Sequence, residues 1–408
     1  MADFIFHDPT GRRDRRAKMG LGLLVSLAAL IVAGFFATLA FAPRLPELSL
    51  KDPHVLQALH VETARRLKGK PAWTHVPRRP NAGQPGGPTR PLAVGFYDPT
   101  DPSSRDSLAK HIGELDVVSP QWLALNGSLG RVTIVPDAET EAIIAAAKNT
   151  PSVLPILHNF YNGLPNGPLA DKLLANPAAR AALVNNLVAA AKAHGYGGYV
   201  FDLEDLSDPA LNQYLGLLAA ARAALKPLGR EVWVAVPFAD PDFKLKKFQA
   251  VTDTVVLMAY DQHWDGGQPG PIAGEDWFET NLAKDAAQLD PAHMVVALGS
   301  YGYDWTVDKK GKALSGTKVL FYDATQEASD SGDTVSLDEN TLNPTFSYMN
   351  DDGSRHVVWF LDATTIFNEI KVADDYRPRG YALWYMGEED PALWNYFRQP
   401  YGTIRPTG

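Results

Sequence analysis

Two carboxylates, two residues apart, close a strongly apolar run near the middle of the chain. The run spans 198–204 and ends in Asp202-Leu203-Glu204. Alternate residues of a strand point to the same face, so we expect the two side chains to project together, roughly 6–7 Å apart. Mutual repulsion and partial desolvation would raise the pKa of one carboxyl group, which could then protonate a leaving group near neutral pH. The alternative is a strand end whose acids are solvated in a loop.

Polar and aromatic groups end three other apolar runs. These groups are His158 and Asn159 in the first, Tyr260 and Asp261 with Gln262-His263-Trp264 in the second, and Trp384 in the third. A tryptophan inside a strand can form a floor for a sugar ring, whose C–H face packs on aromatic rings. Each group also has a purely structural interpretation. Trp384 could be a core residue, Tyr260 and Asp261 could cap a strand, and the loop could be shaped by Gln262, His263 and Trp264.

The elements that must position these residues are strands alternating with helices. The candidate strands are 92–97, 115–123, 153–160, 198–204, 232–238, 254–260, 294–301 and 381–386, and helical patterns between them include 177–194, 209–225 and 277–289. This alternation predicts an α/β fold, a (β/α)₈ TIM barrel over 91–398, with the reactive groups at the carboxyl ends of its strands. A doubly wound open sheet is the second choice.

The stretch 306–379, between the last two predicted strands, is too long for one crossover helix. Segments 345–349 and 356–361 flank Asp351-Asp352-Gly353 and predict a hairpin, and 363–373 predicts a helix. We therefore expect a small α+β insertion between strands 7 and 8, beside the barrel mouth.

An uncharged apolar segment, 19–43, follows five basic residues within the first 18. A helix of this length spans a bilayer, and the preceding charges predict a basic tail, 1–18, in the cytoplasm. The body would face the periplasm or exterior, as in a single-pass protein of the inner membrane. A cleaved signal is the alternative, since Ala40-Phe41-Ala42 is typical of a cleavage site. Pro43 would then follow the cut, which favours an uncleaved anchor.

Residues 44–90 combine a short helical pattern with a Pro/Gly-rich tether, and 399–408 form a tail. The chain carries a net charge of −9, and because segments 1–18 and 44–90 are net positive, the body 91–408 is strongly acidic. An acidic body does not suit nucleic acid, and it would attract a partly cationic glycan. There is no cysteine, and no histidine spacing typical of a metal site. We expect no metal and no cofactor.

Three segments resemble signatures of glycoside hydrolase family 18, which includes chitinases and N-acetylglucosaminidases. The run 198–204 resembles the fourth-strand signature that ends Asp-x-Glu, and 258–261 resembles the sixth-strand Met-x-Tyr-Asp. Segment 381–394 resembles the eighth-strand Trp followed by the Gly-x-Glu-Asp-Pro-x-x-Trp segment. The similarity covers about 91–398. It implies a glycosidase acting on a polymer of β-1,4-linked N-acetylglucosamine.

The resemblance also implies roles. Glu204 would be the general acid, Asp202 would orient the substrate's 2-acetamido group as the nucleophile, and Tyr260 would bond the developing oxazolinium. Substrate-binding residues would be Trp384, Asp261, Trp122, Asn159, Tyr97, Met258 and Gln262.

One departure from the family pattern leaves a second function class open. The family has acids two and five residues before Asp202, where this chain has Val200 and Gly197. The enzyme is therefore weighed against a glycan-binding domain that serves polysaccharide synthesis or remodelling without turnover. Segments 94–97 and 118–123 resemble a hydrolase-like domain of bacterial membrane proteins, where polysaccharide deacetylase and family 2 glycosyltransferase modules follow it. Such modules are expected partners.

Overall fold

A parallel sheet curls into a barrel at the centre of the computed structural model, which describes residues 90–387 and 389–403. The sheet has eleven strands, but two barrel positions are each split into two short strands, and β4 (Val132–Ile134) pairs antiparallel at the edge. The barrel positions in chain order are β1 (Leu92–Tyr97), β2 with β3 (Val117–Pro120, Leu123–Leu125), β5 with β6 (Ser152–Val153, Ile156–His158), β9 (Gly198–Asp202), β10 (Glu231–Pro237), β11 (Thr254–Met258), β12 (Met294–Gly299) and β18 (Gly380–Met386).

The split strands close the ring. β2 pairs with β1 and with β5, whereas β3 pairs with β6, which in turn pairs with β9. Pro155 lies between β5 and β6 and has no N–H for the ladder, which accounts for the interruption there. The predicted strands 115–123 and 153–160 are therefore each two strands. The remaining pairings are parallel and run through β18 back to β1, so the open-sheet alternative is wrong.

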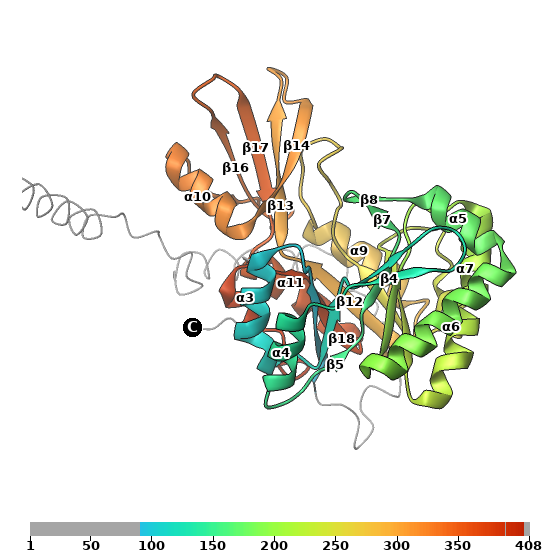
Figure 1. The fold of residues 1–408 in the computed structure, drawn as a ribbon. Coiled ribbons are helices and arrows are strands. Elements are labelled where there is room, and N and C mark those ends of the chain that lie inside the picture. The colour runs from blue at the N-terminus through green and yellow to red at the C-terminus, as the bar shows by residue number, and fades with distance from the viewer. Residues whose placement is uncertain (1–89, 388, 404–408) are drawn as a thin grey trace, which may run out of the picture. The chain divides into compact units, whose positions relative to one another are not determined.

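Helices cover the outside of the barrel, as the pattern of alternating elements predicts (Figure 1). They are α3 (Pro102–His111), α4 (Ala138–Ala146), α5 (Gly167–Ala175), α6 (Pro177–His194), α7 (Asp208–Leu225), α8 (Leu245–Val251), α9 (Glu275–Ala286) and α11 (Ala363–Ala373). Several begin at a side chain that accepts a backbone N–H, among them Asp101, Asp137 and Asn176. Proline in the first turn, as in α3 and α6, adds a second start signal.

A small antiparallel sheet with one helix projects from one end of the barrel (Figure 1). Its elements are β13 (Tyr301–Val307), β14 (Ala313–Leu320), α10 (Phe321–Ser331), β15 (Ser336–Leu337), β16 (Pro344–Met349) and β17 (Arg355–Phe360). β16 and β17 form the expected hairpin. The insertion has different bounds from the predicted 306–379. It begins at Tyr301, because β13 pairs with both β14 and β17 in the small sheet, and α11 packs on α9 and β12 as a barrel helix.

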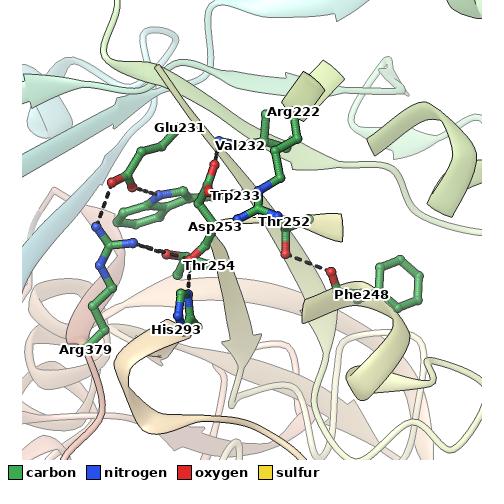
Figure 2. A network of polar contacts seen from close by, with 10 residues as sticks. All are labelled: Arg222, Glu231, Val232, Trp233, Phe248, Thr252, Asp253, Thr254, His293 and Arg379. Carbon is green, nitrogen blue, oxygen red and sulfur yellow. Dashed lines mark hydrogen bonds and ion pairs between the residues drawn. The ribbon is translucent and has the colours of Figure 1, made fainter. Parts of the chain in front are cut away.

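Polar contacts tie together the opposite end of the barrel, where β10, β11 and β18 start (Figure 2). The guanidinium of Arg379 pairs with Glu231 at 2.9 Å and lies 5.2 Å from the ring centre of Trp233. Asp253 accepts a hydrogen bond from Arg222 at 2.8 Å and another from the Val232 N–H. Residues at the amino ends of barrel strands generally serve stability, and this network links the starts of three strands.

In residues 90–387 and 389–403, no helix has both the length and the apolar character needed to cross a membrane. The predicted tail, anchor and tether, 1–89, lie outside the described residues.

Candidate active site

Asp202 is the last residue of β9, and Glu204 follows it at the carboxyl end of the barrel. The Asp202 side chain is 6% exposed, and its Oδ1 has no hydrogen-bond partner among the described residues. Val200, one inward-facing position earlier on β9, belongs to the apolar barrel core. Because an unpaired charge is costly in such surroundings, this oxygen requires a proton or a donor from a ligand.

The peptide of Glu204 is held from the third strand. Asn159 Oδ1 accepts the Glu204 N–H at 3.0 Å, and Asn159 Nδ2 donates to the Glu204 carbonyl at 2.9 Å. Asn159 is 1% exposed, so its amide is fully committed to this contact. We therefore assign Asn159 a positioning role in place of the predicted contact with substrate.

Burial raises the pKa of both carboxyl groups. The pKa of Glu204 is raised further by the charges of Asp202, Asp261 and Asp205. The pair therefore retains a proton at a pH where isolated carboxyl groups are ionised. Glu204 is less buried than Asp202 and is the better placed of the two to donate that proton.

Aromatic rings line the same end of the barrel. The Tyr260 ring lies nearly parallel to that of Trp384, with their centres 6.4 Å apart, and Trp384 meets Phe96 edge-on at 5.3 Å. Burial raises the pKa of the Tyr260 hydroxyl well above its usual value, and the charges of Asp202, Asp261 and Glu204 add to the effect. Tyr260 therefore stays a hydrogen-bond donor beside the carboxylates. Met258, which is partly buried, packs against the barrel core cluster to which Phe96 and Tyr260 belong.

The insertion completes the site at Asp261. The hydroxyl groups of Tyr301 and Tyr303, both on β13, donate to Asp261 Oδ1 at 2.7 and 3.0 Å. Asp261 has a left-handed backbone (φ 59°), which an aspartate tolerates better than most residues. Burial raises its pKa, and the two tyrosine hydrogen bonds oppose that shift. Sequence reasoning missed these tyrosines, although Tyr301-Gly302-Tyr303 at a strand end was a usable signal.

A lysine from the insertion also reaches this region. Lys318 Nζ on β14 lies 4.5 Å from the ring centre of Tyr301 and 4.2 Å from that of Tyr385. Burial lowers the pKa of Lys318, and the charge of Asp261 opposes this. The ammonium group thereby fastens the insertion to the end of β18 through cation–π contacts.

Two predicted substrate-binding residues point elsewhere. Tyr97 is 1% exposed, and its hydroxyl donates to Asp137 at the start of α4, at 2.9 Å. Trp122 is buried and packs on Tyr196, which follows α6. The Tyr97 hydroxyl is therefore engaged at the start of α4, and the Trp122 ring is buried against the segment between α6 and β9.

Gln262 also has a structural role. Its side-chain Oε1 accepts the Gly274 N–H at 2.8 Å, and the backbone N–H of Gln262 donates to the Ile272 carbonyl. These bonds close the loop between β11 and α9. Of the predicted substrate-binding residues, Asp261 lies close enough to Glu204 to raise its pKa, and Trp384 stacks on Tyr260.

Neither of two surface hollows contains these residues. One, of about 360 Å³, lies between α10 and the β16–β17 turn, and the other, of about 280 Å³, lies beside α3. In the part of the chain that the structure describes, no three histidine, aspartate or glutamate side chains gather closely enough to hold a metal ion.

A barrel whose fourth strand ends in Asp-x-Glu, with a tyrosine at the sixth and a tryptophan at the eighth, defines a class of sugar-cleaving enzymes. The family model described as "Glycosyl hydrolases family 18" matches residues 170–389. The chain belongs to this family and is a glycoside hydrolase.

Relatives and solved structures agree with this assignment. The chain is 24% identical over 324 residues to the "Uncharacterized glycosylase YvbX" of Bacillus subtilis, covering 76% of this chain and 91% of that protein. It is 24% identical to the "Cortical fragment-lytic enzyme" of the same organism, covering 69% and 66%. The fold is similar to that of a chitinase from Chromobacterium violaceum, with a TM-score of 0.68, 24% identity, and coverage of 75% and 97%. It is also similar to the spore cortex-lytic enzyme SleL of Bacillus cereus, with a TM-score of 0.68, 21% identity, and coverage of 76% and 74%.

Proposed function

We propose that the protein cleaves polysaccharides containing β-1,4-linked N-acetylglucosamine, with retention of configuration and with the substrate's own acetamido group as nucleophile. The observation that carries the proposal is the pairing of a buried Asp202, whose Oδ1 lacks a donor, with a Glu204 that retains its proton. The N–H of a 2-acetamido group would supply the missing donor.

In the first step, the Glu204 carboxyl group gives its proton to the glycosidic oxygen as the bond from that oxygen to the anomeric carbon breaks. The acetamido carbonyl oxygen forms a new bond to the anomeric carbon, which yields a cyclic oxazolinium ion. Asp202 accepts the acetamide N–H, and Tyr260 donates to the same group, so both stabilise the developing charge. Trp384 packs against the sugar ring.

In the second step, water attacks the anomeric carbon. The Glu204 carboxylate takes a proton from that water, the bond to the acetamido oxygen breaks, and the acetamide re-forms. The sequence needs no second carboxylate nucleophile, as in other substrate-assisted glycosidases.

A binding module without turnover remains the second candidate, and Val200 is the residue that favours it. At this position the family signature has an acid that tunes Asp202, whereas here the side chain is part of the apolar core. Retention of both Asp202 and Glu204 favours the enzyme.

The test compares oligomers of N-acetylglucosamine with oligomers of glucosamine and glucose. We expect cleavage of the first alone, and tight binding of a thiazoline that mimics the cyclic intermediate. Cleavage of glucose oligomers would refute the acetamide mechanism. Binding of N-acetylglucosamine oligomers without any cleavage would establish the binding module instead.

We further propose that 19–43 anchors the protein in the inner membrane with its body outside the cytoplasm, near deacetylase and glycosyltransferase modules. The uncharged segment and the basic residues before it support this. Fractionation should place the protein with the membrane. A soluble mature protein that starts near residue 43 would contradict the anchor.

A further inference from the structure

A serine, a histidine and an aspartate are joined by hydrogen bonds on the small sheet of the insertion. The Nδ1 of His356, on β17, lies 2.8 Å from the carboxylate of Asp304 on β13, and its Nε2 lies 3.1 Å from the Oγ of Ser354. A serine within hydrogen-bond reach of a base, with the base oriented by a third group, is the arrangement that activates a serine as a nucleophile.

This cluster is separate from the carboxylates of the barrel. Tyr301 and Tyr303, which bond Asp261, alternate with Asp304 along β13, so Asp304 points to the opposite face of the small sheet. On that face Asp304 and His356 are diagonal neighbours, because Asp304 is paired with the residue two positions after His356.

The contacts of the imidazole fix which nitrogen carries the proton. Asn350 Nδ2, which can only donate, lies 3.1 Å from His356 Nε2, so Nε2 is the acceptor and the proton is on Nδ1, facing Asp304. Tyr348 stacks on the imidazole with ring centres 4.6 Å apart, and its hydroxyl donates to Asp304 at 2.7 Å. The histidine therefore has the tautomer that can take a proton from a serine.

The cluster borders the hollow of about 360 Å³ between α10 and the β16–β17 turn. The side chains of His356 and Asp304 are only 12% and 16% exposed, whereas Ser354 lies in the turn just before β17. Asn350 and Asp352, which contact the imidazole and the Ser354 hydroxyl, both line the hollow. A molecule bound there would meet the hydroxyl group, with the Asn350 amide beside it as a donor to a developing oxyanion.

The Ser354 hydroxyl has two acceptors for its single proton. Its Oγ lies 2.6 Å from Asp352 Oδ1 and 3.1 Å from His356 Nε2. Ser354 is activated only while its proton is directed to the imidazole, because Asp352 holds the hydroxyl without leading its proton to the base. Asp352 thus restrains the serine, which offers a variant that should raise its reactivity.

We propose that Ser354, His356 and Asp304 form a second hydrolytic site, which cleaves carboxylic esters of neutral or cationic alcohols. The alcohol is not anionic, because carboxylates line the hollow and would repel one. An acylated sugar belongs to this class of ester, and the barrel belongs to a family that acts on sugars.

The reaction needs only the ester and water. Ser354 Oγ forms a bond to the carbonyl carbon while His356 Nε2 takes the hydroxyl proton. The bond from that carbon to the alcohol oxygen then breaks, and Nε2 gives the proton to the leaving oxygen. Water attacks the acyl-serine with Nε2 again as base, the bond to Oγ breaks, and Ser354 regains its proton as the carboxylic acid leaves.

The first experiment treats the full chain with a fluorophosphonate, which reacts with activated serines, and locates the adduct by mass spectrometry. We expect the adduct on Ser354, with its rate of formation lowered by about 10²-fold or more in His356→Gln. Ser347→Ala, at an exposed serine on the neighbouring strand β16, should be labelled like the unchanged protein. No adduct on Ser354, or equal rates in His356→Gln and the unchanged protein, would overturn the proposal.

Asp352→Asn distinguishes a catalytic cluster from a structural one. The amide oxygen can still accept the Ser354 N–H, as Asp352 Oδ1 does at 2.8 Å, but it holds the hydroxyl proton more weakly than a carboxylate does. Labelling of Ser354 and hydrolysis of p-nitrophenyl acetate should therefore both rise several-fold, whereas damage to the turn would lower them. Rates that do not rise in Asp352→Asn, or hydrolysis that persists undiminished in Ser354→Ala, would refute the second site.

Discussion

The side-chain amide of Asn159 holds the main chain of Glu204 by two hydrogen bonds: its Oδ1 accepts the Glu204 N–H at 3.0 Å, and its Nδ2 donates to the Glu204 carbonyl oxygen at 2.9 Å. A general acid must keep its carboxyl group within hydrogen-bond reach of the leaving oxygen. The residues around Glu204 lie beyond the end of β9, so no strand pairing fixes their main chain. Asn159 takes over that task from the neighbouring strand.

Asn159→Asp tests this role. The new carboxylate oxygen would face the Glu204 carbonyl where Nδ2 now donates, so the second bond becomes a repulsion. We expect kcat to fall by about tenfold or more with a smaller change in KM, because a misplaced acid acts in the transition state. Steady-state kinetics on N-acetylglucosamine oligomers would measure both constants.

The control is Asn343→Asp. Asn343 makes the same two bonds to the main chain of Ala273, in a segment that carries neither carboxylate. Both variants should lose stability, by about 1–3 kcal/mol. An equal fall of kcat in the two variants would show that Asn159 has only a structural role.

Glu204→Gln removes the proton donor and keeps the size of the side chain. Hydrolysis should fall by on the order of 10²-fold or more, the usual effect of losing a general acid, while oligomer binding persists. Chromatography of the released products would measure hydrolysis, and calorimetry would measure oligomer binding. Turnover close to that of the unchanged protein would remove Glu204 from the mechanism.

Asp205→Asn should shift the pH dependence. The charge of Asp205 helps to raise the pKa of Glu204, so its removal lowers that pKa and Glu204 loses its proton at lower pH. The alkaline limb of kcat/KM should therefore move to lower pH. Asparagine suits the left-handed backbone of residue 205 (φ 56°), so the fold should tolerate the change. Asp208→Asn, at the start of α7, should leave the limb in place.

Glu369 on α11 makes stability depend on pH. It is 0% exposed, both of its carboxyl oxygens lack partners among the described residues, and burial raises its pKa well above the usual value, with Glu275 and Asp362 adding to the effect. The protonated Glu369 contributes its full stabilisation below the unfolded-state pKa, about 4.3. As the pH rises from there toward the folded-state pKa, the free energy of unfolding falls by about 1.4 kcal/mol per pH unit.

Glu369→Gln should flatten this slope in denaturant titrations at several pH values, because the amide does not ionise. Glu339→Gln, at an exposed position, serves as the control and should keep the original slope. Identical slopes for Glu369→Gln and the unchanged protein would mean that Glu369 is ionised in the folded state.

Arg379→Met should weaken the amino end of the barrel. It removes the ion pair with Glu231, the hydrogen bond to Thr254 and the contact with Trp233, at a cost of about 1–3 kcal/mol. Thermal unfolding would measure the loss, and kcat should stay unchanged, since the network lies at the end remote from the carboxylates. Arg105→Met, which removes a more exposed pair with Glu139, should cost much less. Similar losses in the two variants would rule out a special role for the Arg379 network.

The order of strands and helices could be predicted because each barrel strand is an apolar run bounded by a helical pattern, and α6 and α11 have the predicted bounds. The direction in which individual side chains point could not be predicted. Strands of a parallel barrel are buried on both faces, so alternation does not separate inner from outer positions. The resemblance implies that Tyr97 and Trp122 bind substrate, whereas the Tyr97 hydroxyl donates to Asp137 and the Trp122 ring packs on Tyr196.

The carboxylates and Tyr260 could be placed from the sequence because their spacing and strand-end positions mark them. The roles of Asn159, Tyr301 and Tyr303 depend on partners distant in the chain. Asn159 bonds a residue 45 positions away, and Tyr301 one 40 positions away. A polar residue at a strand end does not reveal whether it meets substrate or a neighbouring segment.

The two tyrosine hydroxyls that β13 gives to Asp261 mean that the small sheet is not an interchangeable module. Excising it would leave a carboxylate of the sixth strand without its donors, in surroundings that disfavour its charge. An engineer who grafts a different insertion onto this barrel would have to retain Tyr301-Gly302-Tyr303 at the junction. The functional boundary between the barrel and the small sheet therefore lies after Tyr303, within the segment that the sheet topology assigns to the insertion.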